Sequence, residues 1–352
     1  MRKYRKEILK PIIVVALLFS MISCSPSIIY QPPVNDPLVL TGSGNESLSI
    51  LTYNIQTVFG KDENKLDALL DYIDRERFDF VLFQELFDEA ARNYIRKNLN
   101  TGTYKCVVTR IDYESFPELL FQDSGLYLMS RYPQINLSGI GFNDQVSVSE
   151  GAVHMILNKE VSLSTDFLAN KSVMGSLHQI SDSTYLFLFT THLQALGSKR
   201  HKRRQYRQIR DFIGYTVHTV LGSGTVESPQ NMIVILTGDF NSDAYDQDDL
   251  ETLLSNLGSP RDLHSEFNPG HKEYTMRFKL FNMYKRFDYI FAYDRIGSVP
   301  LRSVSIQSIN ATDVQNAENA SISDHLALKA SVSLDEPAAA TAYYRSGERS
   351  AK

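Results

Sequence analysis

Residues 232–243 constrain the fold more than any other part of the chain. They read MIVILTGDFNSD, an apolar and largely β-branched run that stops at Gly238 and leads into Asp239 and Asn241. Such a run predicts a buried strand, and ligands usually bind where the strands of a sheet end. Residues two apart in an extended chain point to the same side, so we expect Asp239 and Asn241 to face one pocket, with Phe240 in the core. Their oxygen atoms suit Mg²⁺ bound with a phosphate, although Gly-Asp-x-Asn is also common turn chemistry.

The N-terminal residues differ from the rest of the chain. A basic start is followed by an apolar run over residues 11–22, too short to span a membrane and typical of a signal peptide. It ends in Met-Ile-Ser-Cys24, which resembles the lipobox of bacterial lipoproteins. We therefore expect a signal peptide over residues 1–23, lipidation of Cys24 and a tether over residues 24–47, rich in Pro, Ser, Gly and Asn. An uncleaved signal anchor or a cytosolic protein with an apolar leader is the alternative.

Composition indicates a globular protein with an acidic body. The 352 residues are 43 % hydrophobic and 22 % charged, with a net charge of −5. Without residues 1–23, which carry +4, the net charge becomes −9. An acidic body is a poor non-specific binder of nucleic acid, so this balance disfavours a nuclease without excluding one. The only other cysteine, Cys106, is expected to be a buried apolar residue, and no intramolecular disulfide is expected.

Apolar periodicity predicts alternating strands and helices through one domain, residues 48–334. The expected helices lie at 64–76, 89–98, 206–220 and 250–257. The expected strands lie at 48–55, 78–83, 104–109, 126–130, 151–157, 172–180, 185–191, 232–238, 287–293 and 327–334. The tail over residues 335–352 is expected to be disordered. The basic run 199–204 could contact anionic headgroups or phosphates, but we favour a solvated lead-in to the helix that follows.

Polar side chains recur where these predicted strands end. Any one of them alone would usually be a cap, a turn residue or a satisfied histidine. The complete set indicates a functional site: Asn54, Glu85, His192, Asp239, Asn241, Asp288, Asp324 and His325.

The set resembles the endonuclease/exonuclease/phosphatase (deoxyribonuclease I-like) superfamily. The matching pieces occur in the family's order: Thr52-Tyr53-Asn54, Phe83-Gln84-Glu85, Thr191-His192, Gly238-Asp239-Phe240-Asn241, Phe287-Asp288-Tyr289-Ile290 and Ser323-Asp324-His325. The resemblance implies an α/β fold, a four-layer α/β/β/α sandwich with two packed mixed β-sheets.

Within the superfamily, the chain is most similar to bacterial neutral sphingomyelinases. Thr191-His192-Leu193-Gln194-Ala195 and Asp123-Ser124-Gly125 resemble segments of that branch. Two features depart from it. Residues 309–323 contain no aromatic residue where secreted members carry an aromatic hairpin for membrane insertion, and Gln122-Asp123 stands where two acidic residues are usual. The second departure weakens the case for an additional metal at the edge of the site.

The resemblance implies metal-dependent hydrolysis of sphingomyelin, or of a related sphingophospholipid, to ceramide and a phosphorylated headgroup. The implied ligands of Mg²⁺ (Mn²⁺ or Co²⁺ as alternatives) are Glu85, Asn54 and Asp324. His325 would act as the base oriented by Asp288, His192 would donate to a phosphoryl oxygen, and Asp239 and Asn241 would position water or metal. Tyr274, Thr275, Phe281 and Tyr284 are candidates for the headgroup pocket, since aromatic faces bind quaternary ammonium groups, or they are core residues.

Other functions remain open at this point. A nuclease, or a sugar or inositol phosphatase, of the same superfamily is the first alternative, and a non-catalytic surface-binding lipoprotein is the second. We expect a monomer that meets a phospholipid substrate, has no specific nucleic-acid partner, and is held by its lipid anchor at the outer membrane, on its periplasmic or surface face.

Overall fold

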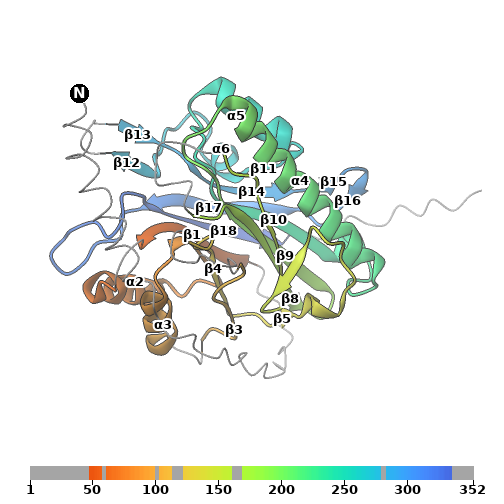
Figure 1. Ribbon diagram of the computed structural model, residues 1–352, viewed down its shortest axis with the longest axis horizontal. Helices are drawn as coiled ribbons and strands as arrows, with labels where there is room; N and C mark the ends of the chain where they lie inside the picture. Colours follow the sequence, from red (N-terminus) through yellow and green to blue (C-terminus); the bar gives the residue numbers. More distant parts are fainter. Residues whose placement is uncertain are drawn as a thin grey trace, which may run out of the picture.

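Two β-sheets lie face to face, and helices cover their outer faces (Figure 1). The computed structural model describes residues 47–57, 61–99, 103–112, 122–160, 169–278 and 283–334. The expected four-layer α/β/β/α sandwich is therefore confirmed.

The first sheet contains the N-terminal strands and the two closing strands. Its order is β17 (Val304–Thr312), β18 (Ala327–Leu334), β1 (Ser47–Thr57), β2 (Phe80–Leu86), β4 (Tyr127–Ser130) and β3 (Cys106–Val108). The β1–β2 pair is parallel and the other neighbours are antiparallel, so the sheet is mixed. Helices α2 (Glu63–Glu76) and α3 (Glu89–Asn98) pack on its outer face.

The second sheet contains the apolar strand that ends at Asp239. Its order is β11 (Arg261–Asp262), β14 (Asp288–Tyr293), β10 (Met232–Asp239), β9 (Thr184–His192), β8 (Ser172–Ser181), β7 (Ala152–Ile156) and β6 (Ser147–Ser149), and β5 (Gln134–Ile135) also pairs with β8. Only the β9–β10 pair is parallel among these described strands. Helices α4 (Lys199–Gly222) and α5 (Gln247–Leu257) pack on its outer face.

Short elements complete the described chain. They are α6 (Leu263–Phe267), the hairpins β12 (Met276–Phe278) with β13 (Met283–Lys285) and β15 (Arg295–Ile296) with β16 (Val299–Pro300), and the 3₁₀ helices η1 (Leu137–Gly139) and η3 (Pro229–Asn231). None of the described helices combines the length and the apolarity that a bilayer span requires.

Three apolar clusters hold the layers together. The central one contains residues of both sheets, such as Ile50 of β1 and Ile235 of β10, and the other two join each sheet to its helices. Helix α2 forms because Leu66, Leu69, Leu70 and Ile73 recur at helical spacing and Asp62 caps its start. Cys106 is buried, as expected.

Strand register brings the ends of three neighbouring strands of the second sheet together. Asp239 at the end of β10 pairs with His192 of β9 on one side and with Asp288 of β14 on the other. A buried hydrogen-bond pair links the two sheets nearby, because Gln84 Nε2 donates to the hydroxyls of Thr52 and Thr190 at 3.1 Å each. The ends of β1 and β2 in the first sheet therefore lie next to the ends of β9 and β10 in the second sheet.

Two expectations need correction. Strand β17 was not expected, because its exposed side is polar and its apolar alternation is weak, and pairing with β18 stabilises it instead. The basic run 199–204 is not a lead-in, since α4 begins at Lys199 and contains the whole run. The leader, Cys24, most of the tether, Phe281 and the tail lie outside the described residues, so those expectations stay predictions.

Candidate active site

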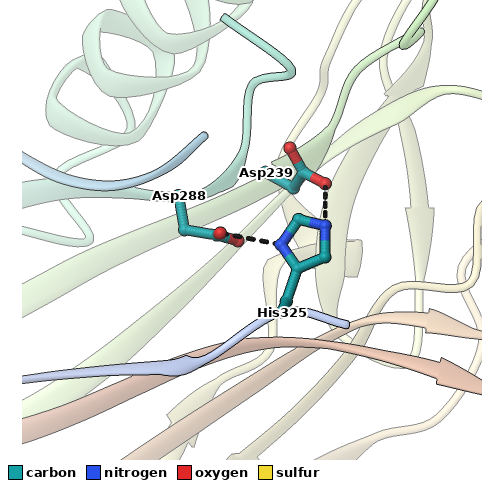
Figure 2. A group of neighbouring side chains, drawn as sticks. All are labelled: Asp239, Asp288 and His325. Carbon is teal, nitrogen blue, oxygen red and sulfur yellow. Dashed lines mark hydrogen bonds and ion pairs between the residues drawn. The ribbon is translucent and has the colours of Figure 1, made fainter. Parts of the chain in front are cut away.

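A buried histidine–carboxylate pair lies at the centre of the strand ends. His325 Nδ1 is 2.8 Å from Asp288 Oδ2, and its other ring nitrogen, Nε2, is 3.6 Å from Asp239 Oδ2. Figure 2 shows the imidazole between the two carboxylates. The backbone N–H of His325 donates to the Ser323 hydroxyl, which itself donates to the carbonyl of Asn54. The closing loop is thereby fixed to β1, and the ring is held with Nε2 toward Asp239.

The charges of this group depend strongly on one another. Burial disfavours the charged imidazole, but the carboxylates of Asp288 and Asp239 outweigh it and raise the pKa of His325 to about 10. Burial also raises the pKa of Asp239 to about 7, with His325 acting in the opposite direction. Positive charge added near Asp239 would lower both pKa values, because it would stabilise the carboxylate and repel the imidazolium.

A second carboxylate meets Asp239 from the other sheet. Asn54 Nδ2, on β1, donates to Glu85 Oε1 and to Asp239 Oδ2, at 3.0 Å in each case. Glu85 adopts a positive φ of 56° at the end of β2, where the register between β1 and β2 shifts. One amide therefore bridges two carboxylates that belong to different sheets. Glu85 is partly exposed, whereas Asn54 and Asp239 are buried.

His192 faces the same two carboxylates. Its Nε2 lies 3.5 Å from Glu85 Oε1 and 3.8 Å from Asp239 Oδ2. Burial lowers the pKa of His192 well below its usual value, and Lys171 and His325 act in the same direction, so the ring is neutral near pH 7. Lys171 Nζ lies 3.5 Å from Nδ1. Because an ammonium can only donate, this contact assigns the ring proton to Nε2, which faces the site as a donor.

Asn241 lies in a tight turn rather than in an extended chain. Its φ is 49°, its backbone N–H donates to Asp239 Oδ1 at 2.8 Å, and its side-chain Nδ2 donates to the carbonyl of Leu193 at 2.9 Å. The expectation of alternating side chains across residues 239–241 is therefore wrong for Asn241, although Phe240 is buried as expected. Turn chemistry overrides strand geometry here because Asp239 accepts the backbone N–H two residues later.

Two sets of side chains could hold a cation. Asp239, Asp288 and His325 each offer a ligand atom, and these atoms all lie within 4.8 Å of one another. A cation among these three would have to break the 2.8 Å hydrogen bond between His325 and Asp288. The second set is Glu85, which is partly exposed, with Asn54 beside it and Asp324. This donor set fits a hard divalent cation.

Asp324, expected as a ligand, lies at the rim of the cluster. Its Oδ2 accepts from Gln56 Nε2 at 3.2 Å, and the backbone N–H of Gln56 donates to Asn54 Oδ1 at 3.1 Å. Gln56 thus connects Asp324 to Asn54. Sequence reasoning missed Gln56 because no motif marks it.

Asp123 pairs with two arginines and does not form a second metal site. Both of its oxygens accept from the Arg92 guanidinium at 2.7 Å, and Arg110 Nε lies 3.1 Å from it. Arg92 and Asp123 are both buried. A guanidinium already compensates this carboxylate, so the residues here do not fit an additional cation.

The headgroup candidates divide into two kinds. Tyr274 and the exposed Tyr284 lie with ring centroids 5.6 Å apart, and Tyr274 also contacts Tyr245 at 5.7 Å. Thr275 is buried and is not a lining residue, because its hydroxyl accepts the backbone N–H groups of Phe287 and Asp288. Thr275 therefore orients the start of β14, a role that carries no sequence signal.

Residues 51–325 match the model of the Endonuclease/Exonuclease/phosphatase family. The chain belongs to this family. The match includes every site residue described above, from Asn54 to His325. Members of the endonuclease/exonuclease/phosphatase family are hydrolases, which agrees with the carboxylate and histidine chemistry of the site.

One curated protein matches part of this chain. An uncharacterized protein from Dictyostelium discoideum is 25 % identical over 189 residues, which are 48 % of this chain and 14 % of that protein. The chain thus spans only a small part of that relative.

Solved structures share the fold at low identity. Sphingomyelinase C from Streptomyces griseocarneus has a TM-score of 0.53 at 17 % identity, covering 81 % of this chain and 99 % of its own. D. rerio TDP2 complexed with a single-strand DNA product has 0.55 at 17 %, covering 81 % and 98 %. A Staphylococcus aureus beta toxin mutant with bound magnesium ions has 0.51 at 17 %, covering 81 % and 99 %. At such identities the likeness shows the fold alone.

Proposed function

We propose that the protein is a Mg²⁺-dependent phosphodiesterase that hydrolyses sphingomyelin, or a related sphingophospholipid, to ceramide and a phosphorylated headgroup. The observation that carries the reaction type is the His325–Asp288 pair facing Asp239, with Glu85 and Asn54 adjacent. The sphingomyelinase-like motifs and the fold shared with a sphingomyelinase C support the substrate class.

The residues of this chain take distinct roles in the proposed hydrolysis. His325 accepts a proton from the attacking water at Nε2, and Asp288 holds the ring through Nδ1 and stabilises its charged form. His192 donates from Nε2 to a non-bridging phosphoryl oxygen, where negative charge grows. Asp239 positions the water, and Asn241 fixes the turn that follows it.

A divalent ion would be held by Glu85, with Asp324 at the rim. Asn54 would join them only by turning its amide, because its nitrogen faces Glu85 and its oxygen accepts from the backbone N–H of Gln56 in this structure. When bound, it would polarise the phosphoryl oxygens and, by its charge, lower the pKa of His325. Magnesium in a structure of the same fold supports this choice of ion.

The tyrosine pair near β14 is our candidate for headgroup recognition. Tyr274 and Tyr284 present two rings 5.6 Å apart, and Thr275, next to Tyr274 in the chain, orients Asp288. A quaternary ammonium is attracted to aromatic faces by about 0.5–2 kcal/mol. Replacing Tyr284 by Ala should therefore raise KM for sphingomyelin more than it changes kcat.

A nuclease of the same family is the second candidate. The observation in its favour is the equally similar fold of a TDP2 that was solved with a single-strand DNA product. The acidic body of the chain argues against it.

The test of the substrate uses the full chain in detergent micelles that contain sphingomyelin, with Mg²⁺ or with a chelator. Release of phosphocholine and ceramide that requires Mg²⁺ is expected, with single-stranded DNA left intact. Cleavage of DNA without release of phosphocholine would keep the metal-dependent hydrolysis and replace the substrate.

The membrane anchor is a separate proposal that rests on Cys24. Metabolic labelling with palmitate should label the wild-type chain but not Cys24→Ala. Label that survives this substitution, or no label on the wild type, would remove the lipoprotein anchor and with it the outer-membrane location.

A further inference from the structure

The first turns of α4 carry an unbalanced positive charge. Residues 199–210 contain seven Lys and Arg, and residues 195–210 contain no Asp or Glu. Lys199, Arg200 and Arg203 are exposed, and among the described residues no carboxylate pairs with them. This surface stands out because the body of the chain is acidic.

The charge also opposes the helix on which it lies. The N-terminal end of a helix carries a partial positive charge, which favours acidic residues in its first turn. The first turn of α4 has no acidic residue and begins with Lys199 and Arg200. The basic residues therefore destabilise this end of the helix. Their charge and the helix dipole together attract an anion from outside the protein.

A cavity of about 560 Å³ opens beside these turns. It is lined by Lys159, Glu160, Ser198, Arg200, His201, Arg204 and Arg207. His201 is only 8 % exposed, and its Nε2 has no hydrogen-bond partner. Glu160 is the one acidic residue in the lining, and it already accepts from Ser198. The lining is thus cationic, and it contains one buried nitrogen without a hydrogen-bond partner.

An exposed apolar side chain precedes the basic turns. Leu196 is 59 % exposed, in the short segment that joins His192 of the candidate active site to α4. Lys202, in the first turn of α4, donates to the backbone carbonyl of Asn241 at 2.7 Å. The basic surface and Leu196 are therefore connected to the candidate active site through His192 and through Asn241.

We propose that Leu196 and the first turns of α4 form a docking surface for a membrane that contains anionic phospholipids. Lys199, Arg200, Arg203 and Arg204 contact the headgroups, and Leu196 enters the interface. The surface extends the proposed function, since it would hold the site at a lipid substrate without an aromatic hairpin.

A lipid surface fits these residues better than a nucleic acid does. Proteins that bind single strands stack bases on exposed aromatic rings. The one aromatic residue in 195–210 is Tyr206, which is buried, and the exposed apolar residue is aliphatic. An aliphatic tip beside clustered Lys and Arg is typical of membrane-surface contacts.

The test measures flotation of the full chain carrying Cys24→Ala, which has no lipid anchor, with phosphatidylcholine vesicles, with and without phosphatidylglycerol. The variant is Lys199→Glu/Arg200→Glu/Arg203→Glu, and the matched control is Arg75→Glu/Arg77→Glu/Lys97→Glu on α2, its C-cap and α3, which are also exposed. Each Lys or Arg near an anionic surface contributes about a factor of five to partitioning. The increase in vesicle partitioning that phosphatidylglycerol causes should therefore be about 100-fold smaller for the variant than for the wild type. The control should show the same increase as the wild type. Leu196→Asp should lower binding about 10-fold.

The outcomes separate this proposal from others. Acidic residues in the first turn favour a helix, so the α4 variant should melt no earlier than the wild type, and lost binding cannot be put down to unfolding. Equal losses in the variant and the control, or none in either, would overturn the docking surface. So would loss of single-stranded DNA binding with vesicle binding unchanged. Flotation needs no turnover, so it holds or fails independently of the proposed reaction.

Discussion

Nδ1 of His325 lies 2.8 Å from Oδ2 of Asp288, although the two residues are 37 positions apart in the chain. The pair forms because β14 begins at Asp288 and the loop before β18 carries His325 to the same edge of the sandwich. The Thr275 hydroxyl accepts the backbone N–H groups of Phe287 and Asp288 and so fixes the backbone that carries this carboxylate.

Asp288→Asn should lower kcat by about 10² to 10⁴ with little change in KM. The amide keeps the size of the side chain but removes the charge that stabilises imidazolium at His325. Steady-state kinetics on a phosphodiester gives both constants. Asp294→Asn, which follows the same strand and pairs with Arg261 at its surface, is the matched control and should behave as the wild type. Equal effects of the two substitutions would contradict the role of Asp288.

Gly238→Ala should lower the free energy of unfolding by about 3 kcal/mol or more. A Cβ at Gly238 would stand 2.0 Å from the carbonyl oxygen of Thr191, at a φ of 131°. Denaturant unfolding measures the change. Gly214→Ala in α4 is the control with the opposite sign, because its Cβ would meet only Ile296 at 3.8 Å. It should stabilise the helix by about 0.5–1 kcal/mol.

Arg92→Met should cost about 3–5 kcal/mol of folding free energy, since it leaves the buried Asp123 carboxylate short of its main partner. The control is Arg210→Met, which breaks the exposed pair with Asp211 and should cost at most about 1 kcal/mol. Urea midpoints at neutral pH measure both changes. A neutral result for Arg92→Met would show that Arg110 alone compensates Asp123.

His178→Phe should reduce the acid sensitivity of the fold. Burial lowers the pKa of His178 from 6.5 to about 3, so between these pH values the unfolded chain binds a proton that the folded chain does not. Stability therefore falls as pH drops below about 6.5, by about 1.4 kcal/mol per pH unit for one such group. The variant should lose that part of the slope, measured by urea unfolding from pH 8 to pH 4. An unchanged slope would contradict the prediction.

Strong local patterns predicted most of the secondary structure, but not its weaker edges. The bounds of α3 and the end of β18 follow directly from apolar spacing and capping residues. Strand β17 was not predicted, because about half of its residues face solvent and its apolar pattern is weak. Pairing with β18 stabilises this strand. The start of α4 at Lys199 was not predicted, because basic residues at the N-terminal end of a helix oppose the helix dipole.

Site residues at the ends of apolar strands could be predicted from the sequence. Residues that support the site through tertiary contacts could not. Asp239, Asp288 and His325 end or flank apolar strands, so their positions could be expected. Lys171, Gln56 and Thr275 hold other side chains or the backbone in place, and these contacts depend on the packing of distant segments. Asn241 left the expected geometry because a local turn competes with the strand.

The central claim is that His325 and a metal held at Glu85 act together in phosphodiester hydrolysis. The most direct test measures phosphocholine release from sphingomyelin micelles by the wild type, by His325→Ala and by Glu85→Ala, each with Mg²⁺ and with chelator. We predict metal-dependent release by the wild type and a loss of about 10² to 10⁴ in each variant, with circular dichroism unchanged. Release by either folded variant at the wild-type rate, or wild-type release that survives the chelator, would contradict the account.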